Sequence, residues 1–121
     1  MNQIHDPQLL KGVLSPLLLW LLAERESYGY ELVQRLRQIG LTGIADGTVY
    51  PALARLEREG RVSTRLVASR SGPARKYYRP TDDGYAALTE STGNWLSLTE
   101  IVSPVLARPV PPQPAPPAEE N

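Results

Sequence analysis

The stretch between Gly60 and Pro80 changes its hydrophobic period, and this change constrains the fold most. Ahead of it, apolar residues recur every three or four positions, as they do in amphipathic helices. Within it, Val62, Thr64 and Leu66 alternate with polar neighbours, as in a half-buried strand. The pattern therefore predicts a mainly α-helical chain that carries one small β-hairpin.

Two helices are predicted in the first third of the chain. Ser15 followed by Pro16 is typical of a cap and a first helical residue, so the first helix is expected from Pro16 to about Glu24. An alternative is that this helix continues upstream across a kink at the proline. Ser27 is expected to cap a second helix over residues 28–39, which Gly40 would end.

Two further helices flank the hairpin. The third is expected to begin near Gly47 or Thr48, because Pro51 fits only in a first turn, where its missing N–H is not needed. The fourth is expected to be capped by Thr81 and to be broken at Pro104. The Pro-rich stretch after it is typical of an extended or disordered tail.

Composition excludes several classes of function. The 121 residues suffice for one domain of ordinary size and include no Cys and one His. Thiol nucleophiles and Cys-rich zinc sites are therefore excluded, and any metal or Ser-His-Asp chemistry would require His5. We expect His5 to be an ordinary surface residue, so we expect no enzyme, no catalytic or metal site, and no cofactor.

The apolar run at residues 17–23 is much shorter than the roughly 20 residues that a membrane span requires. It is interpreted as part of a core helix. The residues before it lack the pattern of a secretory signal. We therefore expect a cytoplasmic protein without a membrane partner.

Charge is balanced over the whole chain, with 13 basic and 13 acidic residues, but it is unevenly distributed. From Arg61 to Arg79 every charged residue is basic. A neutral chain with one basic segment indicates a local anionic partner.

The predicted order of three helices and a basic hairpin is that of a winged helix-turn-helix, whose third helix enters a DNA major groove. Thr48 and Tyr50 fall at the exposed start of that third helix, and Arg55 lies near the same end. Helix N-termini and basic side chains are the groups that phosphates bind. The candidate phosphate contacts at the hairpin tip are Arg70, Gly72, Arg75 and Lys76.

Three motifs resemble the successive signatures of PadR-type bacterial transcriptional regulators. They are SYGYELVQRLR at residues 27–37, DGTVYPALARLEREGRV at residues 46–62 and GPARKYYRPTDDG at residues 72–84. The resemblance covers about residues 9–95. It implies a homodimeric winged-helix repressor of the short subfamily, whose single C-terminal helix crosses the first helix of the partner subunit.

The same resemblance assigns DNA contacts and a domain division. It implies DNA contacts at Tyr28, Thr48, Tyr50, Pro51, Arg75 and Lys76. The expected division is a DNA-binding winged helix-turn-helix at residues 1–80, a dimerisation helix at 81–104 and the Pro-rich tail at 105–121.

A dimer is also expected from an apolar stripe on the fourth helix, which a small winged domain cannot wholly cover. Its members are Leu88, Trp95, Leu98 and Val102. In the family arrangement Trp20 and Trp95 would lie at the dimer seam, either as packing anchors or as the lining of a cavity for a planar aromatic effector. Trp95 matches the position of a tryptophan that forms such a site in some short PadR-like regulators.

The sequence thus predicts a sequence-specific, DNA-binding repressor. The expected partners are duplex DNA, a second copy of the same chain and a small aromatic effector. Two alternatives stay open. One is a winged-helix module that binds protein through the same surface and offers its proline tail as a ligand. The other is an enzyme that acts through His5, the only histidine in the chain.

Overall fold

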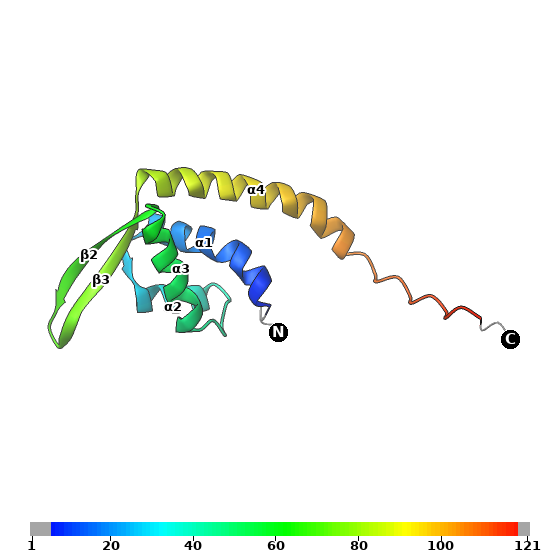
Figure 1. The fold of residues 1–121 in the computed structure, drawn as a ribbon, viewed down its shortest axis with the longest axis horizontal. Helices are drawn as coiled ribbons and strands as arrows, with labels where there is room; N and C mark the ends of the chain where they lie inside the picture. The colour runs from blue at the N-terminus through cyan, green and yellow to red at the C-terminus, as the bar shows by residue number, and fades with distance from the viewer. Residues whose placement is uncertain (1–5, 119–121) are drawn as a thin grey trace.

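The computed structural model describes residues 6–118, so His5 lies outside the described residues. Figure 1 shows a helical body with a long hairpin on one side, a helix running across the body, and an extended tail leading away from it. The elements in chain order are α1 (Pro7–Glu24), β1 (Ser27–Tyr28), α2 (Gly29–Gln38), α3 (Asp46–Arg58), β2 (Val62–Ser69), β3 (Gly72–Pro80) and α4 (Asp82–Leu106). The prediction of a mainly α-helical winged helix-turn-helix fold is confirmed.

Helix α1 forms the centre of the body and contacts α2, α3, α4 and β3. It begins at Pro7 with Asp6 as its cap, and the Asp6 carboxylate accepts a hydrogen bond from the Gln8 N–H at 3.0 Å. The predicted start at Ser15 and Pro16 is therefore wrong, and the upstream alternative is confirmed. Pro16 is accommodated inside the helix, where its missing N–H affects only the carbonyl of exposed Gly12.

Ser27 does not cap α2, contrary to the prediction. It lies in the two-residue strand β1, and its hydroxyl accepts a hydrogen bond from Arg35 at 3.0 Å. Tyr28 takes the cap position with extended backbone and makes no side-chain capping bond. The hydroxyl is held by a buried guanidinium instead of the helix N-terminus.

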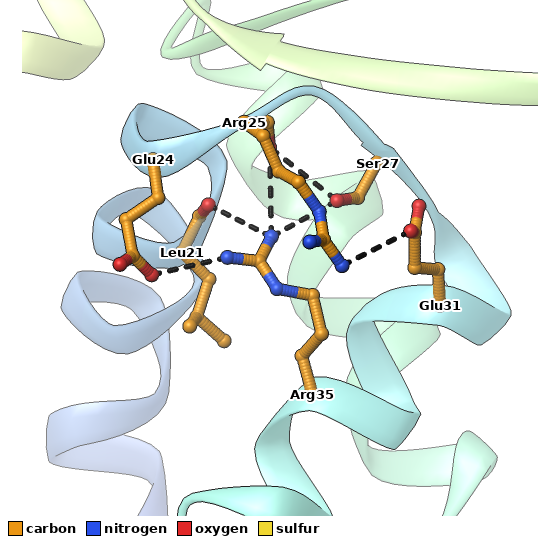
Figure 2. A network of polar contacts seen from close by, with 6 residues as sticks. All are labelled: Leu21, Glu24, Arg25, Ser27, Glu31 and Arg35. Carbon is orange, nitrogen blue, oxygen red and sulfur yellow. Dashed lines mark hydrogen bonds and ion pairs between the residues drawn. The ribbon is translucent and has the colours of Figure 1, made fainter.

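Arg35 connects three elements of the body (Figure 2). Its Nη1 donates to the Leu21 carbonyl at 2.9 Å and to Ser27, and its Nη2 donates to the Glu24 carboxylate at 3.0 Å. The Leu21 carbonyl lies in the last turn of α1 and also accepts the Arg25 N–H at 3.2 Å. Arg35 therefore joins the end of α1 to β1 and α2 through a cation that is itself nearly buried.

Helix α3 presents one apolar side to the core, as predicted. Val49, Leu53 and Leu56 are fully buried. The helix is followed by Gly60 at φ +75°, a left-handed conformation that favours glycine. The loop before α3 is fixed by Arg37, which donates two hydrogen bonds to the Ile44 carbonyl at 3.0 and 3.2 Å.

The three strands form an antiparallel sheet in the order β1-β3-β2, so β3 is central. Ser27 pairs with Tyr78, and Thr64 pairs with the same tyrosine from the other side. Tyr78 is buried, with 7% of its surface exposed. Leu66, however, is 72% exposed, so the expected half-buried alternation fails where the hairpin extends beyond the helical body.

Helix α4 begins as predicted, with the Thr81 hydroxyl accepting a hydrogen bond from the Gly84 N–H at 3.1 Å. It does not break at Pro104 but continues to Leu106. A proline in the last turn removes one N–H from an exposed helix end, so the turn can persist. The domain division proposed from the sequence stays a prediction.

Leu88 is buried in the core of its own chain, with 8% of its surface exposed. It was expected on the dimer stripe, and this placement is corrected. The predicted stripe wrongly included Leu88, because the first turns of α4 pack on α1 of the same chain. Trp95, Leu98 and Val102 lie farther along the helix and remain accessible within one chain.

Gly84 should tolerate no side chain, whereas Gly93 on the same helix should. A Cβ at Gly84 would lie 2.0 Å from the Arg61 carbonyl oxygen, and a Cβ at Gly93 would meet nothing within 4 Å. We expect Gly84→Ala to lower the free energy of unfolding by about 1–3 kcal/mol. We expect Gly93→Ala to raise it by about 0.5–1 kcal/mol, because alanine is favoured over glycine inside a helix. Denaturant unfolding of both variants measures the difference, and equal effects would contradict the close approach of α4 to Arg61.

Candidate nucleic-acid interface

One face of the molecule brings together four residues singled out in the sequence. Tyr28, Tyr50, Arg75 and Lys76 line a hollow of about 200 Å³. They come from the start of α2, the start of α3 and the middle of β3. The remaining lining is Gly29 and Tyr78. Residues that are far apart in the sequence thus form one surface of aromatic rings and cations.

Arg75 lies over the Tyr28 ring, with its guanidinium carbon 4.5 Å from the ring centroid. The Tyr28 ring in turn contacts Tyr77 edge-on, at a centroid distance of 5.4 Å. No ion pair among the described residues involves Arg75. Stacking on a neutral ring orients the guanidinium and leaves its charge uncompensated.

Tyr50 stands close to the backbone of α2. A Cβ at Gly29 would lie 2.4 Å from the Tyr50 ring, so glycine is needed for this approach. Burial, and secondly the Asp46 carboxylate, raises the pKa of the Tyr50 phenol. The phenol therefore stays protonated at neutral pH and can donate a hydrogen bond.

Thr48, Pro51 and Arg55 do not line this hollow. They lie along a second groove, of about 510 Å³, which α3 shares with the first half of α1. Thr48 and Tyr50 are both exposed and the intervening Val49 is fully buried, as the sequence predicted. Two positions in a helix differ by about 200° in direction, so the two exposed side chains flank α3.

Arg70 and Gly72 lie at the hairpin tip and are exposed. β2 ends at Ser69 and Gly72 is the first residue of β3, so the turn between them consists of Arg70 and Ser71. Both residues are outside the two grooves. Arg70 makes no ion pair with another described residue.

Two of the hairpin cations have carboxylate partners that the sequence analysis missed. The Lys76 Nζ lies 2.8 Å from Glu57 of α3, and the Arg65 Nε lies 2.8 Å from Glu26. The partners are 19 and 39 residues apart in the chain, so no local pattern links them. The segment from Arg61 to Arg79 contains no acidic residue, but carboxylates from other parts of the fold neutralise some of its positive charge.

These contacts shift the pKa values of the groups that make them. A hydrogen bond from Lys76 holds the pKa of the Glu57 carboxyl below its usual value, and the same bond raises the pKa of Lys76. Arg65 similarly lowers the pKa of Glu26. Both pairs are thus fully ionised at neutral pH and carry no net charge. Arg55 is paired as well, with Glu59 one helical turn away at 3.3 Å.

The arrangement suits an anionic polymer better than a small substrate. It combines an uncompensated guanidinium, neutral hydroxyl donors and the exposed start of a helix, which are groups that contact phosphates and base edges. In residues 6–118 no cluster of His, Asp and Glu could hold a metal ion. No helix in that part of the chain is long and apolar enough to cross a membrane.

Large apolar side chains are also exposed on α1 and on the second half of α4. Trp20 is 55% exposed and Trp95 is 43% exposed, and Leu98, Ile101 and Val102 are accessible as well. No aromatic contact between the two tryptophans occurs within the described chain. In Figure 1 the second half of α4 extends past the body that its first turns cover.

Residues 18–90 match the sequence profile described as "Transcriptional regulator PadR-like family". Among solved structures, the chain is similar to a PadR-like transcriptional regulator from Bacillus cereus, with 38% identity and a TM-score of 0.74 over 84% of this chain and 99% of that one. A PadR family transcriptional regulator from Eggerthella lenta shows 37% identity and a TM-score of 0.73, over 83% of this chain and 87% of that one.

Two curated proteins are also similar. One is the Lysinibacillus sphaericus protein named "Uncharacterized protein X", which is 32% identical over 96 residues, or 78% of this chain and 88% of its own length. The other is "Transcriptional regulator Rv3488" from Mycobacterium tuberculosis, which is 45% identical over 69 residues, or 56% of this chain and 62% of its own length.

Proposed function

We propose, from the premise that this chain belongs to the PadR-like family of transcriptional regulators, that it is a sequence-specific repressor acting as a homodimer on DNA in the cytoplasm. Because the family consists of transcriptional regulators, the expectation that the chain is not an enzyme is confirmed on that ground. The proposed role is repression, because a dimer bound at a promoter would sterically block other proteins from binding the same DNA.

The observation that carries the proposal is Arg75 over Tyr28, beside Tyr50. The starts of α2 and α3 and the hairpin meet here, and one uncompensated cation is oriented by an aromatic ring. In a winged helix-turn-helix, α3 enters the major groove and the neighbouring elements contact the backbone. We therefore assign phosphate contacts to Tyr28, Arg75 and, at the hairpin tip, Arg70 and Gly72.

Base readout is assigned to Thr48 and Tyr50, with Pro51 fixing the first turn that presents them. Each hydroxyl can bond to a base edge, and a methyl or ring can contact a thymine methyl group. Arg55 is a weaker candidate, because its guanidinium is already paired with Glu59.

Dimerisation is supported by the apolar surface that one chain leaves uncovered. Trp20, Trp95, Leu98 and Val102 lie on α1 and α4, and exposed apolar patches of this extent mark interaction sites. A specific dimer should bury at least about 1,000 Å² in total. Two subunits joined in this way would present two copies of α3 about one DNA turn apart, roughly 34–36 Å.

The proposal also includes a planar aromatic effector that binds at the dimer seam. Trp20 and Trp95 are accessible within one chain and could stack a planar molecule at the seam. Such a ligand would release DNA only if it bound the DNA-free arrangement more tightly than the DNA-bound one. A coupling of about 1–3 kcal/mol would lower operator affinity roughly 5- to 150-fold.

Salt titration should separate the phosphate contacts from base readout. Arg75→Gln removes one phosphate contact per subunit, so we expect the log–log salt slope to become shallower by about 1.8 in the dimer, with sequence preference unchanged. Thr48→Ala should instead change the preferred base at one position per half-site, at a cost of about 1–3 kcal/mol there. Fluorescence anisotropy on operators selected from genomic fragments measures both effects.

The same titrations would also show whether the roles of Arg75 and Thr48 are the reverse of those proposed. Loss of preference in Arg75→Gln would make Arg75 a base contact, and uniform weakening in Thr48→Ala would make Thr48 a backbone contact. Wild-type protein that bound no duplex in a salt-dependent manner would favour the protein-interaction alternative.

The dimer should dissociate when charge is placed on the exposed part of α4. We expect Leu98→Asp with Val102→Asp to be monomeric by light scattering and to bind operator weakly. Leu66→Asp places the same charge on an exposed leucine of the hairpin and should remain dimeric. A double variant that stays dimeric would refute this seam.

Planar aromatic compounds, such as phenolic acids and cationic dyes, should quench tryptophan fluorescence and release operator DNA. Both effects should disappear in Trp95→Ala while light scattering still shows a dimer. If no such compound quenches the wild type and Trp95→Ala dissociates the dimer, Trp95 is a packing anchor and the effector proposal is wrong.

A further inference from the structure

We propose that Glu57 limits the affinity of this protein for random DNA by neutralising Lys76 at the DNA-binding face. The inference rests on the proposed function, because it concerns the same surface. It adds a residue of α3 that lowers binding, whereas every residue assigned so far promotes it.

The geometry of Glu57 joins α3 to both long strands of the hairpin. Its Oε1 accepts from the Lys76 ammonium of β3 at 2.8 Å, and its Oε2 accepts from the Thr64 hydroxyl of β2 at 3.3 Å. The Lys76 Nζ also lies 5.6 Å from the centroid of the Tyr78 ring. The ammonium is therefore held on the α3 side of the hairpin.

The position of the pair matters because Lys76 lines the same hollow as Tyr28, Tyr50 and Arg75. Arg75 and Lys76 are adjacent in sequence, but a carboxylate neutralises only the charge of Lys76. Arg75 stacks on a neutral ring and keeps its full charge, while Lys76 and Glu57 together carry none. A phosphate that approaches Lys76 also approaches a carboxylate.

The pair has more consequence for ligand binding than for folding. Both side chains are accessible to solvent, and exposed ion pairs contribute little to stability. Binding to random DNA, in contrast, depends almost wholly on the number of cations that reach phosphates. Since a genome offers a vast excess of random sites, a lower random affinity leaves more protein for the operator.

A double-mutant cycle on the dimer tests the inference, with wild type, Glu57→Gln, Lys76→Gln and the double variant titrated with salt on a random-sequence duplex. Glutamine keeps the shape of Glu57 and its oxygen acceptor but removes the charge. We expect Glu57→Gln to bind more tightly at low salt and to steepen the log–log slope by about 1.8. From 50 to 200 mM salt its affinity should then fall about 12-fold more than that of wild type.

Lys76→Gln alone removes no phosphate contact, so its slope should stay close to that of wild type, although the Glu57 carboxylate, now without its partner, should lower its affinity. The double variant should lose the gain of Glu57→Gln. The matched control is Glu90→Gln, which removes the same charge from an exposed position on α4. Its slope should equal that of wild type. Light scattering and thermal melting of every variant separate a change in assembly or stability from a change in charge.

Three outcomes would overturn the inference: an unchanged slope in Glu57→Gln, a slope that Lys76→Gln alone makes shallower by about 1.8, or equal steepening in Glu90→Gln. If wild type binds DNA and Arg75→Gln behaves as expected, such an outcome removes only the role of Glu57. If wild type binds no duplex, the proposed function fails and this inference fails with it.

Discussion

The buried guanidinium of Arg35 holds the candidate DNA-binding face in place. It reaches the last turn of α1 through the Leu21 carbonyl, β1 through Ser27 and the Glu24 carboxylate through its second nitrogen. A buried cation is costly unless its donors are satisfied, and here acceptors from two other elements satisfy it. The end of α1, the strand and α2 must therefore keep one relative position.

That position determines where the candidate interface forms. Ser27 is held by Arg35 and also pairs with Tyr78 in the central strand, so the hairpin is anchored to the same point as α2. Tyr28 follows directly and begins α2, which places its ring beneath Arg75. The alignment of cation and ring thus depends on a contact network that does not itself face the ligand.

Local signals predicted most of the fold, and they failed where a distant group competed. Thr81 caps α4 as expected, because its hydroxyl oxygen accepts from the Gly84 N–H at 3.1 Å while its proton goes to the Gly60 carbonyl at 2.7 Å, so the two bonds do not compete. The Ser27 hydroxyl could cap a helix in the same way, but it accepts a hydrogen bond from Arg35 instead. Pro16 resembled a helix start, yet Asp6 supplies a cap nine residues earlier, about two and a half helical turns before the predicted one.

The sequence predicted which residues form the candidate site, but it did not predict which of their charges are neutralised. Tyr28, Tyr50, Arg75 and Lys76 were identified from motifs and element order, and the structure places them around one hollow. Their electrostatic state depends on contacts across 19 or more residues, which no motif reports. Leu88 shows the same limit, since an apolar stripe does not indicate which of its members the chain itself covers.

The alternation of a strand explains why adjacent cations of β3 differ so much. Successive side chains point to opposite faces of a sheet, so Arg75 lies on the face of Tyr77 and Lys76 on the face of Tyr78, although both line the same hollow. The first face receives the Tyr28 ring, and the second faces α3, where Glu57 lies. A one-residue slip of β3 that moved Arg75 into the place of Lys76 would turn the arginine to the face of α3, beside the Glu57 carboxylate. The register of the hairpin therefore decides which cation is left without a carboxylate partner, and the Thr64–Tyr78 pairing fixes that register against the core.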